Sequence, residues 1–145
     1  MGSTEVISNA ATCEPLNNVE ILIVDDDEDI RWLFSHILSK AGYSVKSVCD
    51  SRQALEQIGA KAYDIVILDY ILPEMKGSQL ALEILKKRSD AKIIFITGYS
   101  DFSDELMKTP RLMTQTVLYK PITGENLLKT IKMIQQASDA TIAFK

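Results

Sequence analysis

Short apolar segments alternate along the chain with segments in which apolar residues recur at helical spacing. The expected strands cover residues 19–24, 44–49, 64–68, 92–96 and 116–119. Four of them are apolar nearly throughout, which is typical of strands covered on both faces of a parallel sheet. Helical spacing marks residues 28–41, 51–59, 78–88 and 124–138. This order predicts an α/β fold, a doubly wound five-stranded parallel sheet with helices on both faces.

Proline and glycine limit two of the expected helices. Residues 102–108 could form two helical turns, but Pro110 prevents a long helix because proline has no backbone N–H to donate. We therefore expect a short or irregular fourth helix. In the second helix, Asp50 and Gln53 are spaced as a capping box, and Gly59 is expected to end the helix.

The two ends of the chain lack the periodicity of its centre. Residues 1–18 are rich in Ser, Thr, Asn and Ala, which predicts a disordered N-terminal tail. Residues 19–138 are expected to form one domain, because chains of roughly 100–200 residues usually hold one. Residues 139–145 are then expected to be a short C-terminal tail.

Composition excludes several classes of protein. Hydrophobic residues make up 46% of the chain and charged residues 25%, as in ordinary globular domains. No apolar run approaches the roughly 18 residues of a membrane span. The net charge is −4 and no basic block exists, so we expect no direct nucleic-acid partner and no membrane partner. The two cysteines, Cys13 and Cys49, form no disulfide framework, which favours a reducing, cytoplasmic location.

Polar side chains follow the expected strands at the points where these strands end. Asp25 and Asp26 follow the first strand, Asp69 the third, Thr97 the fourth and Lys120 the fifth. In a doubly wound sheet the carboxyl ends of the strands meet at one edge, where ligands bind. We therefore expect these five side chains to lie together.

Three carboxylates at one edge repel one another unless a cation or a raised pKa neutralises them. Mg²⁺ suits such a site, because it prefers oxygen ligands and usually shares its site with a phosphoryl group. Lys120 adds a charge that can hold an anionic oxygen, and Thr97 adds a hydroxyl donor. These groups are the parts needed for phosphoryl transfer, with a carboxylate as nucleophile.

At this point the sequence resembles the receiver domain of two-component response regulators. The resemblance covers residues 19–138 and depends on VDDDEDIR (24–31), DIVILDYILPEMKG (64–77), FITGYS (95–100) and YKPIT (119–123). It implies a flavodoxin-like (β/α)5 receiver fold. The TGYS stretch, the weak fourth helix and YKPIT are similar to receivers attached to hybrid histidine kinases.

The resemblance implies a role for each site residue. Asp69 would be the phosphoacceptor. Mg²⁺ would be held by Asp26 directly, by Asp25 through water, by Asp69 and by the backbone carbonyl of Ile71. Thr97 would bind a phosphoryl oxygen.

The resemblance also implies the function and the partners. Lys120 would pair with Asp69 or its phosphate, and a cis peptide bond would precede Pro121. The domain would accept a phosphoryl group from a histidine kinase or a histidine phosphotransfer protein and switch a partner interaction. It would catalyse its own phosphorylation and dephosphorylation without being a conventional enzyme. The sequence departs from the family at Val117, where a Tyr or Phe usually acts as a switch aromatic.

Two other functions remain as alternatives. A receiver-like binding module that is never phosphorylated would keep the fold without the chemistry. A haloacid-dehalogenase-type phosphatase would use Asp25 as nucleophile, but it needs a further acidic pair after its lysine, which the chain lacks at a strand end after Lys120. Leu112, Met113 and Tyr119 are candidates for an exposed partner face, and a weak homodimer is a further candidate assembly. The stimulus, the output pathway and whether a longer protein contains this chain are open at the sequence level.

Overall fold

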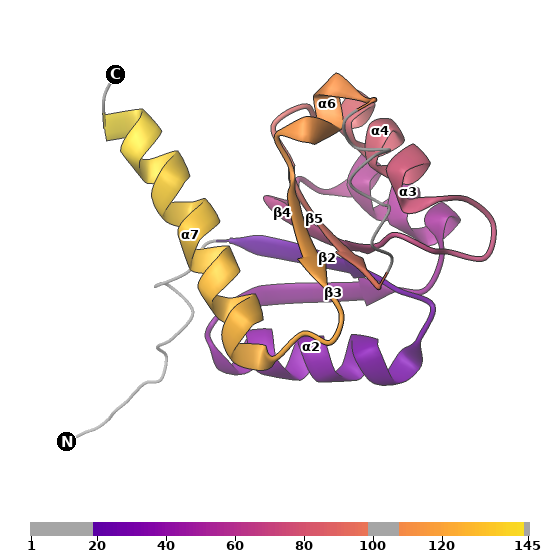
Figure 1. Cartoon of the computed structure of the whole chain (residues 1–145), viewed down its shortest axis with the longest axis horizontal. Coiled ribbons are helices and arrows are strands. Elements are labelled where there is room, and N and C mark those ends of the chain that lie inside the picture. The colour runs from indigo at the N-terminus through magenta and orange to yellow at the C-terminus, as the bar shows by residue number, and fades with distance from the viewer. Residues whose placement is uncertain (1–18, 99–107, 144–145) are drawn as a thin grey trace.

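A five-stranded parallel sheet lies at the centre of the computed structural model, which describes residues 19–98 and 108–143, with side chains to residue 137 (Figure 1). The strands are β2 (Glu20–Val24), β3 (Ser44–Val48), β4 (Ile65–Asp69), β5 (Lys92–Thr97) and β6 (Thr116–Tyr119). Their order across the sheet is β3-β2-β4-β5-β6. Every neighbouring pair is parallel, so the predicted α/β fold is confirmed.

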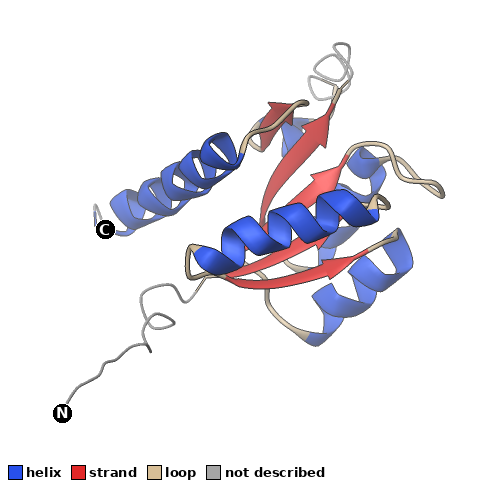
Figure 2. Cartoon of the chain, turned by 90° about the horizontal axis from the view of Figure 1, so that it is seen from below, coloured by secondary structure: helices blue, strands red, loops and turns tan. Residues whose placement is uncertain are grey.

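Helices cover both faces of this sheet (Figure 2). The described helices are α2 (Glu28–Lys40), α3 (Ser51–Ala60), α4 (Gly77–Lys87), α6 (Pro110–Met113) and α7 (Gly124–Ala143). Buried residues of α3, α4 and α6 pack on one face, and those of α2 and α7 pack on the other. Within the described residues, no helix is long and apolar enough to cross a lipid bilayer.

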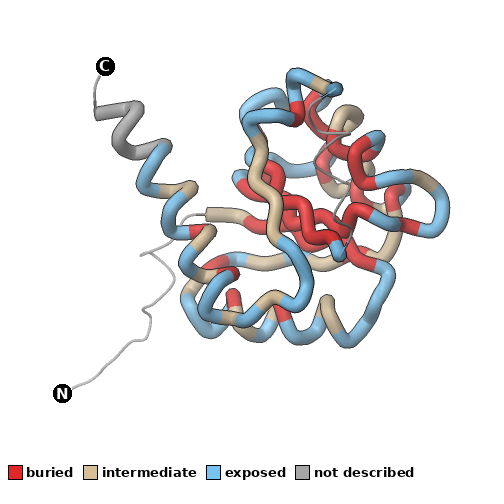
Figure 3. The backbone as a smooth tube through the Cα atoms, viewed as in Figure 1, coloured by how far each residue is buried: buried red, intermediate tan, exposed pale blue. Residues whose placement is uncertain are grey.

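The continuous apolar run of β2 follows from this two-sided burial. Successive side chains of a strand point to opposite faces, and here both faces are covered. Leu22 and Val24 join the core beneath α3 and α4, whereas Ile21 and Ile23 join the core beneath α2 and α7. The central strands are therefore buried along their length (Figure 3).

The ends of two helices differ from the prediction. Gly59 does not end α3, which continues to Ala60; a Cβ at Gly59 would meet nothing within 4 Å. Asp50 caps α3 as predicted, with Oδ1 accepting from Gln53 N at 2.8 Å, but the Gln53 side chain accepts from the N–H of Cys49. Helix α7 continues to Ala143, five residues past its expected end.

The connection between β5 and β6 contains a helix of one turn, α6. Pro110 is the first residue of this helix, a position where its missing N–H breaks no helical hydrogen bond. Residues 99–107, which include most of the expected turns at 102–108, lie outside the described residues. Arg111 ties α6 to α4 by donating from Nη2 to the carbonyl oxygen of Leu85 at 3.2 Å.

Helix α7 is longer than the strands it covers. It has 20 residues, or about 30 Å at 1.5 Å per residue, against five or six residues in most strands. Figures 1 and 2 show its C-terminal part extending past the sheet. Its first residue, Gly124, lies against α2, where a Cβ would be 3.0 Å from Cδ1 of Ile37.

Candidate functional site

Three carboxylates converge where β2 and β4 end. Asp25 and Asp26 follow β2 directly, and Asp69 is the last residue of β4, the neighbouring parallel strand. One carboxylate oxygen from each lies within 4.8 Å of the other two. The parallel pairing of Val24 with Leu68 brings these strand ends level, so the arrangement follows from the sheet register.

Burial makes this cluster electrostatically costly. Asp25 is 3% exposed and Asp69 is 7% exposed, while Asp26 is open to solvent. Burial raises the pKa of Asp25 to about 6, and the nearby Asp69 charge adds to it, against the hydrogen bond from Asp27. Burial also raises the pKa of Asp69, while the Ile71 N–H and Lys120 act in the opposite direction. Both acids would be stabilised as carboxylates by a nearby positive charge.

The turn that leads into α2 is held by the carboxylates themselves. Asp25 Oδ1 accepts from the N–H of Asp27 at 2.9 Å. Asp27 is the N-cap of α2 and accepts from the N–H of Asp29 at 2.9 Å. Glu28 and Asp29 occupy the first turn of α2, where the helix dipole favours negative charge. The acidic run therefore divides into two site residues and three residues that start a helix.

The loop after Asp69 folds back against the strand that precedes it. The Ile71 N–H donates to Asp69 Oδ1 at 3.2 Å, and Ile71 and Lys76 form an antiparallel bridge. At Gly77 a Cβ would lie 2.6 Å from the Asp69 carbonyl oxygen and 2.7 Å from Tyr70 Cα. Only glycine fits at this close approach of two backbone segments.

Thr97 and Lys120 complete the edge from β5 and β6. Thr97 is the last residue of β5 and is 1% exposed, and its carbonyl oxygen accepts from the Lys120 N–H at 2.8 Å. Lys120 Nζ lies 3.9 Å from Asp69 Oδ2, and its own side chain is 43% exposed. The bond between Lys120 and Pro121 is cis, as the resemblance implied. The five side chains singled out in the sequence thus come from the ends of four adjacent strands.

The expected partner face needs one correction. Leu112 is fully buried, because the single turn of α6 packs it against the core beneath α4, so its predicted exposure was wrong. Met113 and Tyr119 are 50% and 47% exposed, as predicted. Val117 packs against the same core as Phe95, its register partner in β5.

The donor set at the edge fits a hard divalent cation. All three candidate ligands are carboxylates, and oxygen donors are what Mg²⁺ prefers, at about 2.0–2.1 Å. Exposed Asp26 leaves one side open to water and to a further anionic group. The carboxylates of Asp25, Asp26 and Asp69 would hold the ion. A contribution from the Ile71 carbonyl remains a prediction.

Two residues of the site were missed at the sequence level. Gly77 closes the loop against the backbone of Asp69, and a glycine eight residues after an acid gives no local signal of such contact. Arg31 donates from Nη1 to the carbonyl oxygen of Asp25 at 2.7 Å. Its position one turn into an expected helix, six residues after Asp25, was the available signal for that contact.

Comparison with known proteins agrees with this geometry. The family described as response regulator receiver domain matches residues 21–132. The probable transcriptional regulator ycf27 of Cyanidium caldarium is 32% identical over 114 residues, which are 79% of this chain and 45% of that protein. The chain spans about half the length, or less, of the curated relatives it matches.

Two of the similar solved structures match over nearly their whole length. The CheY-like receiver domain protein from Methanospirillum hungatei has a TM-score of 0.79 and 27% identity, covering 86% of this chain and 99% of that one. Response regulator protein TrrA from Thermotoga maritima, in complex with Mg²⁺ and BeF, has a TM-score of 0.70 and 33% identity. That match covers 79% of this chain and 97% of TrrA.

Proposed function

Because this chain belongs to the response regulator receiver domain family, we propose that it accepts a phosphoryl group on Asp69 from a phosphohistidine, with Mg²⁺ bound beside it. The observation that carries the proposal is the convergence of Asp25, Asp26 and Asp69 within 4.8 Å at one sheet edge. The complex of the similar protein TrrA with Mg²⁺ and BeF supports the same assignment.

The transfer step makes one bond and breaks one. A carboxylate oxygen of Asp69 attacks phosphorus, a P–O bond forms, and the P–N bond to the donor imidazole breaks. The imidazole leaves and takes up a proton from water. Water later hydrolyses the acyl phosphate, which restores the carboxylate and releases inorganic phosphate. The Ile71 N–H, donating to Oδ1 at 3.2 Å, orients the Asp69 carboxylate for this attack.

Charge neutralisation is the main task of the surrounding groups. Mg²⁺, when bound, supplies positive charge that offsets the phosphoryl oxygens and the acidic cluster. Lys120 Nζ, 3.9 Å from Asp69 Oδ2, is placed to hold a phosphoryl oxygen. The Thr97 hydroxyl at the end of β5 would donate to another. Each group acts on charge that grows during transfer, which is the condition for speeding it.

The partners and the setting follow from this chemistry. A histidine kinase or a histidine phosphotransfer protein would donate the phosphoryl group, and a change of partner interaction would be the output. The domain would act only on its own Asp69 and would not be a conventional enzyme. Attachment to a hybrid kinase, a cytoplasmic location and a weak homodimer stay predictions.

The two alternatives differ in standing. The dehalogenase-type phosphatase with Asp25 as nucleophile is set aside, because the chain belongs to the receiver family. The unphosphorylated binding module has the same fold and the same charges, so chemistry must separate it from the proposal.

Intact-protein mass after incubation with MgCl₂ and phosphoramidate tests the proposal directly. Phosphoramidate has the P–N bond of a phosphohistidine. The parent should gain one phosphoryl group, and Asp69→Asn or excess EDTA should prevent the gain. Asp90→Asn, an exposed acid before β5, is the matched control and should gain the group as the parent does. A parent that binds Mg²⁺ but gains no group from phosphoramidate or acetyl phosphate would favour the binding module.

A further inference from the structure

The backbone that carries the two aspartates after β2 is held at three successive peptide planes. The plane before Asp25 is held by its N–H, which donates to the Val48 carbonyl of β3 at 3.2 Å. The plane after Asp26 is held by the Asp27 N–H, which donates to Asp25 Oδ1 at 2.9 Å. The middle plane joins Asp25 to Asp26, and its carbonyl accepts from Arg31 Nη1 at 2.7 Å.

The carbonyl that Arg31 binds differs in its location from those that Arg88 and Arg111 bind. Arg88 donates to the carbonyl of Ile58 at 3.2 Å, and Arg111 to that of Leu85 at 3.2 Å. Both acceptors lie in the last turns of helices, where carbonyls lack helical partners and basic side chains commonly serve as caps. The acceptor of Arg31 lies outside any helix, between two candidate metal ligands.

Arg31 makes this contact without neutralising the acids. Within residues 19–98 and 108–137, Arg31 forms no ion pair with a carboxylate. Its positive charge near the site should by itself repel a divalent cation. Charge and position therefore make opposite predictions for the effect of Arg31 on metal binding.

We propose that Arg31 is a positioning residue for the metal site: it fixes the peptide plane between Asp25 and Asp26 and so presents their carboxylates to a divalent cation. The proposal rests on the Mg²⁺ site of the proposed function and adds a residue that is no ligand. Mutation of a residue that hydrogen-bonds to a metal ligand commonly weakens metal affinity by about 10–100-fold. Arg31 acts on the ligands through their shared backbone.

Calorimetric titration with MgCl₂ tests the proposal in the unphosphorylated protein. Arg31→Met removes both charge and hydrogen bond. Arg31→Lys keeps the charge but loses the planar fork and the reach of the guanidinium. Arg88→Met is the matched control, because it removes the same charge and the same kind of hydrogen bond far from the acids. Thermal unfolding of each variant without metal measures the purely structural cost.

The expected result is a Mg²⁺ dissociation constant raised at least about 10-fold in Arg31→Met. Arg31→Lys should also bind more weakly than the parent, and Arg88→Met should match the parent. Arg31→Met and Arg88→Met should lose similar thermal stability. The proposal is overturned if Arg31→Met binds Mg²⁺ as tightly as the parent or more tightly, or, should that variant not fold, if Arg31→Lys matches the parent. A parent that binds no Mg²⁺ would instead overturn the proposed function.

Discussion

Both ends of the central sheet carry acidic side chains, but the surroundings of those acids differ. At the carboxyl ends, Asp25 and Asp69 are buried next to each other and burial raises both pKa values. At the amino ends, Glu20 and Asp64 each have a partner. Glu20 Oε1 lies 3.0 Å from Lys61 Nζ, and Asp64 Oδ2 accepts from the Glu20 N–H at 2.8 Å. There the hydrogen bond from Lys61 lowers the pKa of Glu20.

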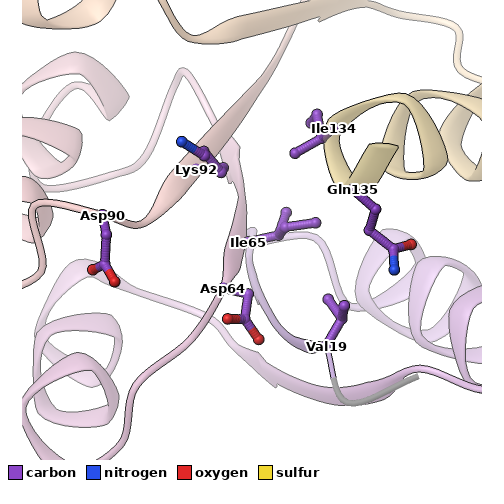
Figure 4. Close-up of a pocket in the computed structure, with 7 residues that line it drawn as sticks. All are labelled: Val19, Asp64, Ile65, Asp90, Lys92, Ile134 and Gln135. Carbon is purple, nitrogen blue, oxygen red and sulfur yellow. The ribbon is translucent and has the colours of Figure 1, made fainter. Parts of the chain in front are cut away.

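The amino end also has the cavity shown in Figure 4. It encloses about 190 Å³ between the strand ends and α7, and Ile134 reaches into it from the helix. Two acids, Asp64 and Asp90, and one basic residue, Lys92, are among the residues that line it. The cavity therefore carries mixed charge, whereas the other end of the sheet gathers acids that need a cation.

This difference separates acids that stabilise the fold from acids that wait for a ligand. Glu20 is only partly buried and is paired with Lys61, so its charge costs the fold little and gains little from metal. Asp25 and Asp69, whose pKa values are raised by burial, cost stability as carboxylates until a cation neutralises them. The following experiments compare the free energy of unfolding of variants changed at one end of the sheet or the other, from the largest expected effect to the smallest.

Substitution of the glycine at each end should give effects of opposite sign. Gly77→Ala places a Cβ 2.6 Å from the Asp69 carbonyl oxygen, so the free energy of unfolding should fall by about 3 kcal/mol. Gly59→Ala fills open space near the end of α3 and should raise it by about 0.5–1 kcal/mol. Urea unfolding followed by Trp32 fluorescence measures both. Equal losses in the two variants would contradict the close approach at Gly77.

Magnesium should stabilise the protein through acids at the carboxyl end of the sheet and not through acids at the amino end. At 100 times its dissociation constant, Mg²⁺ should raise the free energy of unfolding by about 2.7 kcal/mol at pH 7.5. Asp26→Asn should remove most of this gain, because it deletes an exposed ligand without a buried packing defect. Asp90→Asn at the amino end should keep it. Urea unfolding with and without MgCl₂ makes the measurement, and the same gain in all three proteins would argue against the site.

Without metal, the protein should become more stable as the pH falls from 7.5 to 5.5. The folded-state pKa of Asp25 is about 6, above its ordinary value of 3.8, so the folded protein binds more protons in this range. Stability is thus lost as the pH rises through about 6, by about 1 kcal/mol between these two pH values. Asp69, whose pKa is also raised, acts in the same direction.

Asp25→Asn is the variant that isolates this pH effect. It cannot ionise, so the slope of stability with pH in EDTA should be smaller than in the parent, and stability at pH 7.5 should be higher. Unfolding curves at both pH values test this. A parent whose stability rises with pH over the same range would show that other groups dominate.

Glu20→Gln should give the smallest effect, with the opposite pH sense. Because its folded-state pKa is lowered, the stability from Glu20 is present above its unfolded pKa and is lost as the pH falls through the folded one. Its ion pair with Lys61 is partly exposed, and such pairs contribute little because solvent screens them. The stability of Glu20→Gln at pH 7.5 should therefore match the parent, and its response to MgCl₂ should be unchanged.

The elements and the meeting of five polar side chains could be predicted because both depend on local pattern and strand direction. Apolar runs mark buried strands, and parallel strands must end at one edge, so the sequence alone could place Asp25, Asp69 and Lys120 together. For this reason the site residues could be grouped without a prediction of which residues pair between neighbouring strands.

What could not be predicted depends on contacts between distant segments. Leu112 stands in a single turn, too short to show a period, and only α4 decides that it is buried. Gly59 has the residue type of a helix end, but the backbone simply continues for one more residue. The contacts of Gly77 and Arg31 arise only when the loops after β4 and β2 have taken their final paths.

The length of α7 gives the molecule a mechanical property. Its first residue, Gly124, lies four residues after Lys120 and packs against Ile37 of α2. Its C-terminal half lines a cavity with Ile134 and then extends past the sheet (Figure 1). For a rigid rod of about 30 Å, a tilt of about 5° at Gly124 displaces Ala143 by about 2.5 Å. Helix α7 therefore has the geometry of a lever arm, because any tilt at Gly124 would move Ala143 much further than Gly124.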